Sequence, residues 1–157
     1  MTLDKNWSEN MDQPLTIWYC DICGEKITNI SDGYVIWKRR DGKSHDFKII
    51  HTGTCDPRMD YPCSSALEDF LGADGLQILL YQLGSGTIML NLNKGSHCSV
   101  VDSMDEFVDF FRRVQTPYYE QARRCFNNPE LLEFYNDSNE VRPYMEDALK
   151  HIIEKYS

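Results

Sequence analysis

The chain has 157 residues, of which 41% are hydrophobic and 26% are charged, and its formal net charge is −9. This composition excludes collagen-like and disordered proteins, and the length suits one globular unit or a small module joined to a larger one. Such an acidic chain is repelled by nucleic-acid backbones unless its basic residues cluster. No run of 18 apolar residues exists and residues 1–16 have no apolar signal-peptide core, so we expect a cytoplasmic protein without a membrane partner.

Residues 15–62 predict a small β-rich module, a knuckle and hairpin stabilised by zinc, that is separate from residues 63–157. Residues 1–14 are polar and are expected to form a flexible lead. Residues 16–19 are typical of a short strand, and a tight turn at 20–24 follows. The alternating pattern of residues 33–40 and 46–51, joined through Asp41-Gly42, then predicts a β-hairpin.

Two pairs of metal-ligating residues flank this hairpin. Cys20-x2-Cys23 precedes it, and His51-x3-Cys55 follows it. Because the hairpin carries the chain out and back, the second pair returns beside the first. Three thiolates and one imidazole are a standard tetrahedral set for structural Zn²⁺ and disfavour calcium and magnesium. Two alternatives stay open: Cys63 replaces one member of the second pair, or three protein ligands leave an open catalytic site.

The segment WYCDICGEKI, followed by the hairpin and H-x3-C, resembles a treble-clef or zinc-ribbon finger over residues 15–60. A treble clef usually places its second ligand pair on the first turn of a helix. Here Pro57 and Pro62 delay the next helix, so a ribbon-like variant is equally compatible with the pattern. A closed set of four ligands predicts a structural role for the ion, whose binding energy would substitute for the core that the short hairpin cannot build.

The rest of the chain, residues 63–157, predicts an acidic and mainly helical region with 8 Lys and Arg against 15 Asp and Glu. Segments 87–92 and 97–101 predict a small second hairpin. The helix over 75–83 is apolar on nearly every side and is expected to be buried. Further helices are expected, from their capping signals, at 65–72, from Ser103 to about 115, from Thr116 to about 126, over 130–135, and from Pro143 onwards. The predicted class is therefore α+β.

The order of helix, helix and hairpin over 65–101 resembles part of a winged helix. The helix that would read DNA, GLQILLYQL, has no basic residue, so a core helix is the better interpretation. The remaining cysteines, Cys98 and Cys125, are expected to be free thiols that fill the core.

Three functions remain open. The first is a non-enzymatic, protein-binding module with a structural zinc, whose acidic surface meets a protein partner. The second is a nucleic-acid-associated regulator that uses the basic hairpin 37–48, a reading that the net charge disfavours. The third is a zinc metalloenzyme, although the spacing of residues identifies no catalytic set. The candidate partner contacts on the hairpin are Trp37, Lys38, Arg39, Arg40 and Lys43.

Overall fold

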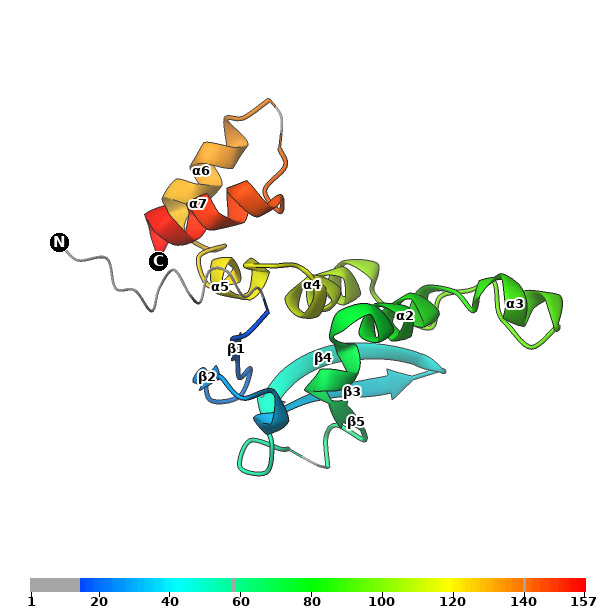
Figure 1. Ribbon diagram of the computed structural model, residues 1–157. Helices are drawn as coiled ribbons and strands as arrows, with labels where there is room; N and C mark the ends of the chain where they lie inside the picture. Colours follow the sequence, from blue (N-terminus) through cyan, green and yellow to red (C-terminus); the bar gives the residue numbers. More distant parts are fainter. Residues whose placement is uncertain (1–14, 58, 140) are drawn as a thin grey trace.

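The computed structural model describes residues 15–57, 59–139 and 141–157, and the predicted lead at 1–14 lies outside them (Figure 1). The strands are β1 (Trp18–Tyr19), β2 (Lys26–Ile27), β3 (Gly33–Arg40), β4 (Lys43–His51) and β5 (Cys63–Ala66). The helices are α2 (Gly72–Leu83), α3 (Gly86–Asn91), α4 (Met104–Gln115), α5 (Tyr119–Arg123), α6 (Pro129–Asn136) and α7 (Glu146–Tyr156). Short 3-10 turns occupy Ile30–Asp32 and Leu67–Phe70. The predicted α+β class, with an N-terminal hairpin before a helical part, is confirmed.

The predicted hairpin is the centre of the larger sheet. Strands β3 and β4 pair antiparallel from Gly33 opposite His51 to Arg40 opposite Lys43. The two turn residues, Asp41 and Gly42, have φ angles of 52° and 77°, the left-handed backbone that a two-residue hairpin turn requires. Strand β5 pairs with the other edge of β3, which gives the order β4-β3-β5.

Helix α4 packs against β4 and completes the first core. Its N-cap is the predicted one, since the Ser103 hydroxyl accepts a hydrogen bond from the Glu106 amide at 3.3 Å. Phe107 and Phe110 are buried, and the ring of Phe110 stacks on that of Phe47 at 4.9 Å between centroids. The helical spacing of the aromatic residues therefore sets which face of α4 meets the sheet.

A second core lies among α5, α6 and α7, where Tyr119, Leu131, Leu149 and Ile152 are buried. The first core extends from Trp18 to Val114 and so crosses residue 62, where the sequence places a domain boundary. That division of the chain stays a prediction.

The predicted second hairpin is wrong, because residues 86–91 form α3. Gly84 and Ser85 precede this helix, which begins at Gly86 with a φ angle of 79°. The helix satisfies the backbone of this segment internally, as in the bond from the Leu92 amide to the Ile88 carbonyl at 3.1 Å. In the returning segment only Val101 forms an isolated bridge, with Ser44 of β4.

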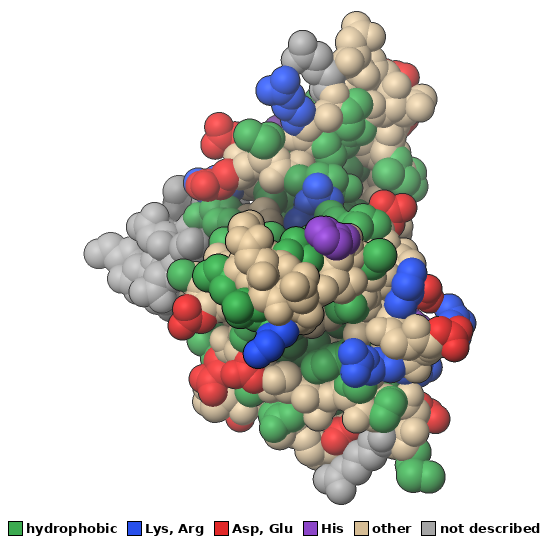
Figure 2. Space-filling view, turned by 90° about the vertical axis from the view of Figure 1, so that its right-hand side faces the viewer, with side chains coloured by type: hydrophobic (Ala, Val, Ile, Leu, Met, Phe, Trp, Pro, Cys, Tyr) green, Lys and Arg blue, Asp and Glu red, His purple; other side chains and the backbone are tan. Residues whose placement is uncertain are grey.

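The predicted burial of the helix over 75–83 is also wrong. In α2 only Gly75 and Leu79 are buried, whereas Ile78, Leu80 and Tyr81 are 42–51% exposed. Figure 2 views the molecule from the side where α3 lies in Figure 1, and hydrophobic and uncharged side chains gather at the middle of this face.

No described helix has both the length and the apolar character needed to cross a membrane.

Several predicted helix starts move in the structure. Helix α2 begins at Gly72, three residues before the predicted start at 75. Ser65 belongs to β5, and only Leu67–Phe70 form a helical turn after it. Helix α5 begins at Tyr119 because the preceding Tyr118 has a left-handed backbone with φ of 65°. Helix α7 begins three residues after Pro143, since Tyr144 sits in a turn that packs its ring 5.7 Å from that of Tyr119.

Candidate metal centre

The first cysteine pair lies in the turn of a short hairpin formed by β1 and β2. The Cys20 amide donates to the Glu25 carbonyl at 2.9 Å, and the Gly24 amide donates to the Cys20 carbonyl at 2.9 Å. Gly24 has a φ of 77°, a conformation that favours glycine. This turn, residues 20–25, is the knuckle named below.

Asp21 fixes the knuckle to β4. Its amide donates to the Ile49 carbonyl at 2.8 Å, and its carboxylate accepts from the Ile49 amide at 2.7 Å. Because β4 ends two residues later at His51, this pair of bonds brings the knuckle beside the second ligand pair. Cys55 follows in the turn after the strand.

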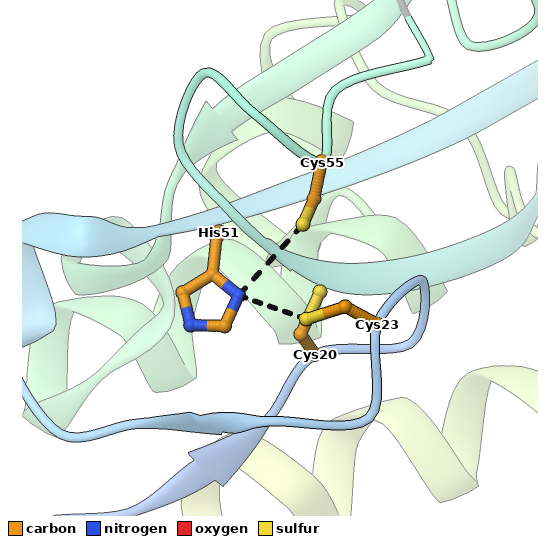
Figure 3. Close-up of side chains that lie close together, drawn as sticks. All are labelled: Cys20, Cys23, His51 and Cys55. Atoms are coloured by element: carbon orange, nitrogen blue, oxygen red, sulfur yellow. Dashed lines mark hydrogen bonds between the residues drawn. The ribbon is translucent and has the colours of Figure 1, made fainter.

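The structure brings together the four residues that the sequence predicts as ligands (Figure 3). The ligand atoms of Cys20, Cys23, His51 and Cys55 all lie within 4.8 Å of one another. His51 Nδ1 is 3.4 Å from the Cys23 sulfur and 3.9 Å from the Cys55 sulfur. Donors around a tetrahedral zinc, at ligand distances of about 2.0–2.3 Å, are separated by about 3.3–3.8 Å. The cluster therefore has the size of a metal-binding site.

The ring of His51 is oriented by a backbone group. Its Nε2 lies 3.0 Å from the Lys26 carbonyl oxygen. A carbonyl only accepts hydrogen bonds, so Nε2 carries the proton and donates it. In the neutral ring Nδ1 is then unprotonated, and Figure 3 shows this nitrogen facing the sulfurs of Cys23 and Cys55. A bond of this kind is the usual support of a metal-binding histidine.

The electrostatics of the cluster favour a thiolate at Cys20. Burial raises the pKa of this thiol, but the amides of Cys23 and Ile22 and the ring of His51 bring it down to about 6. The same contact with Cys20 raises the pKa of His51. Burial, together with the neighbouring sulfurs, raises the pKa of Cys55. At neutral pH the cluster thus already holds one thiolate, the form of cysteine that binds metals.

A buried ionic network connects the knuckle to the helices. Arg113 of α4 is 2% exposed and Glu120 of α5 is 3% exposed. The guanidinium makes two bonds of 2.8 Å to the Glu120 carboxylate and one of 2.7 Å to Asp21. Glu120 also accepts from the Tyr19 amide at 3.0 Å, next to the ligand Cys20. The network therefore holds the residues on both sides of Cys20, Tyr19 and Asp21.

Three positioning residues, Arg113, Glu120 and Asp21, were not predicted from the sequence. One signal for Arg113 exists, because it lies three residues after Phe110 and so shares the core-facing side of α4. A charged residue on that side needs a buried partner. Nothing in the local sequence identifies Glu120 as that partner, since it lies in a different helix.

The basic hairpin residues do not form one free cationic surface. Trp37 is half-buried and packs against Phe47, with ring centroids 6.0 Å apart. Lys38 Nζ lies 3.4 Å from Asp46, and Arg40 bonds to Asp102 at 2.6 Å. Arg39 and Lys43 are exposed. The nucleic-acid interpretation stays a prediction.

The other cysteines lie apart from the cluster. Cys63 is in β5, opposite Trp37 of β3, and is not a member of the four-residue group. Cys125 is buried as expected, whereas Cys98 is exposed, so the prediction that Cys98 fills the core is wrong. Cys98 lies in the irregular segment after α3, where no second layer of structure covers it.

Comparison with protein-family models, with curated proteins and with solved structures finds no match to this chain.

Proposed function

We propose that Cys20, Cys23, His51 and Cys55 bind one structural zinc ion. The observation that carries this proposal is the convergence of four donor atoms within 4.8 Å of one another. Thiolate and imidazole ligands suit zinc and not calcium or magnesium. Four protein ligands complete a tetrahedral shell and leave no open position for a substrate, which is the pattern of structural sites and not of catalytic ones.

The zinc ion would stabilise the knuckle, which is too small to form a hydrophobic core of its own. Strands β1 and β2 have two residues each, and a two-stranded hairpin of this size is not stable alone. A zinc would join this hairpin to the end of β4 and the turn at Cys55. The second ligand pair lies on a strand end and a turn, which supports the ribbon-like variant over a treble clef.

The zinc-stabilised fold would act as a protein-binding module. Support comes from α6 and the segment before α7, where Leu132, Phe134, Val141 and Met145 are 52–60% exposed. A cleft of about 170 Å³ lies beside them, lined by apolar and aromatic side chains that include Leu132 and Val141. This volume is below the usual range of small-molecule sites, about 300–1,000 Å³, and suits a single large apolar side chain.

Charge indicates the chemistry of the partner. Residues 61–157 carry a net charge of −7, and Glu130, Glu133 and Asp137 lie on or directly after the helix that presents Leu132. Opposite charges steer association and suppress wrong partners. We therefore propose that the partner presents a basic segment with one apolar anchor. A helix with Lys or Arg around a Leu or Phe satisfies this description.

The structural role of zinc is tested by thermal unfolding with and without a chelator. Removing the ion or replacing Cys20 with Ser should lower the free energy of unfolding by roughly 3 kcal/mol. For a chain of this size each kcal/mol lowers the melting temperature by about 2–4 °C, so we expect a fall of at least about 6 °C. The matched control is Cys98→Ser, an exposed cysteine outside the cluster. A Cys20→Ser protein that melts with the wild type and the control contradicts the proposal.

The partner chemistry is tested with two synthetic helical peptides that share one Leu anchor, one carrying Lys and the other Glu on the flanks. The basic peptide should bind, and its affinity should fall with added salt and in Leu132→Ser. Ile88→Ser is the control, since Ile88 is an exposed apolar residue on α3. Equal binding of both peptides, or no loss in Leu132→Ser, contradicts the proposed partner.

A further inference from the structure

A larger cleft of about 520 Å³ lies between the knuckle hairpin and the C-terminal helices. One wall comes from β1 and β2, through Tyr19 and Lys26. The facing wall comes from α5 with the residues around it, and from the C-terminal end of α7 at Ser157. In Figure 1, β1 leads up to α5, and the end of α7 lies beside α5. The volume is within the range of small-molecule sites, about 300–1,000 Å³. Such sites are common where two packed parts of a protein meet.

Two cations line this cleft, although the chain as a whole is strongly acidic. They are Lys26 and Arg124, and both side chains are exposed. Among the described residues, neither forms an ion pair with a carboxylate, whereas Lys38, Arg40, Arg113 and others do. The lining described for the cleft also contains no Asp or Glu. Two cations facing one concave site attract an anion.

Aromatic rings form much of the remaining surface. Tyr19, Tyr118 and Tyr156 line the cleft, and the guanidinium of Arg124 lies 4.2 Å from the ring centroid of Tyr19. Tyrosine faces and guanidinium planes stack on planar rings. The Gln121 side chain, which offers both donors and an acceptor, lies in the same lining and is suited to the polar edge of a ring. Lysines already lie over two of these rings, Lys150 over Tyr118 and Lys155 over Tyr156, each 4.9 Å from the ring centroid, so a bound ring would stack on the faces that the lysines leave open.

We propose that this cleft binds a small ligand that joins an aromatic ring to a phosphate group. Lys26 and Arg124 would hold the phosphate, and the tyrosines would stack on the ring. Two sources share this chemistry, a free mononucleotide and a phosphotyrosine residue. The ligand contacts do not include the proposed zinc ligands, but Tyr19 and Lys26 lie on the hairpin that the proposed zinc would stabilise.

The test is titration calorimetry on the full chain as purified, with four probes: AMP, N-acetyl-phosphotyrosine amide, adenosine and inorganic phosphate. We expect AMP or the phosphotyrosine amide to bind with a Kd below about 1 mM, and adenosine and phosphate to bind at least tenfold more weakly. Lys26→Ala and Arg124→Ala should each weaken binding about 10- to 100-fold, the range expected for a hydrogen bond to a charged group. Whichever of AMP and the phosphotyrosine amide binds with the lower Kd identifies the source of the ligand.

Lys94→Ala is the matched control, since Lys94 is an exposed lysine beyond α3, outside the cleft. Binding that Lys94→Ala weakens as much as Lys26→Ala would show general charge attraction and overturn the proposal. The absence of binding by both ring-bearing phosphates, equal binding of inorganic phosphate, or full affinity in both cleft variants would overturn it as well. Elemental analysis of the same sample separates the two proposals, because a protein that lacks zinc and still binds AMP refutes only the metal assignment.

Discussion

Replacing Glu120 with Ala should destabilise the protein strongly, because it breaks the buried network that connects the knuckle to α4 and α5. The substitution removes both 2.8 Å bonds that the carboxylate makes with Arg113. It also leaves the Tyr19 amide without the acceptor that lies 3.0 Å away. Arg113, 2% exposed, then keeps one carboxylate partner, Asp21, and the Tyr19 carbonyl.

The size of the effect follows from burial. Removing one member of a buried ion pair costs about 3–5 kcal/mol, because the other charge stays out of water without compensation. Leaving the partly buried Tyr19 amide unsatisfied costs up to about 1–3 kcal/mol more, and the contact of Arg113 with Asp21 offsets part of the total. We therefore expect a loss of about 4 kcal/mol in the free energy of unfolding, a large share of the ~5–15 kcal/mol typical of a domain.

Urea denaturation measures this loss. With a slope of about 2 kcal/mol per molar, the midpoint should fall by about 2 M. Arg40→Ala is the matched control, since it removes an Arg–carboxylate pair of similar length, 2.6 Å, in which the arginine is 67% exposed. Exposed pairs contribute about 0–1 kcal/mol. A Glu120→Ala protein no less stable than Arg40→Ala would refute the reasoning that burial sets the cost.

Two further predictions concern the helical part. Ser103→Ala removes the cap of α4 and should lower the free energy of unfolding by about 1 kcal/mol in urea titrations, whereas an unchanged midpoint would show that the bond to the Glu106 amide contributes nothing. Asp109 has a lowered pKa, since burial raises it but the bonds from Arg123 and Tyr119 lower it more. Its folded pKa is thus below its unfolded one, so its contribution to stability is present above about pH 4 and is lost as the pH falls through the folded value. Stability should therefore fall less steeply with acid in Asp109→Asn, and parallel acid-denaturation curves for the two proteins would contradict this.

The sequence predicts elements well where a local signal determines the structure. The β3–β4 hairpin follows from strand alternation and from Asp41-Gly42, whose preference for left-handed backbone fits a two-residue turn. Helix α4 begins where Ser103 can cap it. The metal ligands are predictable for the same reason, because a hairpin of regular length returns the second pair to the first.

The remaining features depend on contacts between distant segments. Residues 87–92 are apolar and β-branched enough to suggest a strand, yet residues 86–91 form the helix α3. The exposed apolar side of α2 cannot be predicted from the sequence of this helix alone, because the tertiary packing decides which side is covered. The Arg113–Glu120 pair joins two helices, and neither helix alone signals it.

The central claim is the Cys3His zinc site, and the most direct test is metal analysis combined with zinc-edge X-ray absorption on the wild type, His51→Ala and Cys63→Ala. We predict one zinc per chain bound by three sulfurs and one nitrogen. The Cys63→Ala protein should keep this spectrum, and His51→Ala should lose the nitrogen or the ion. A protein without zinc, a first shell containing oxygen, or a site that depends on Cys63 and not on His51 would contradict the account.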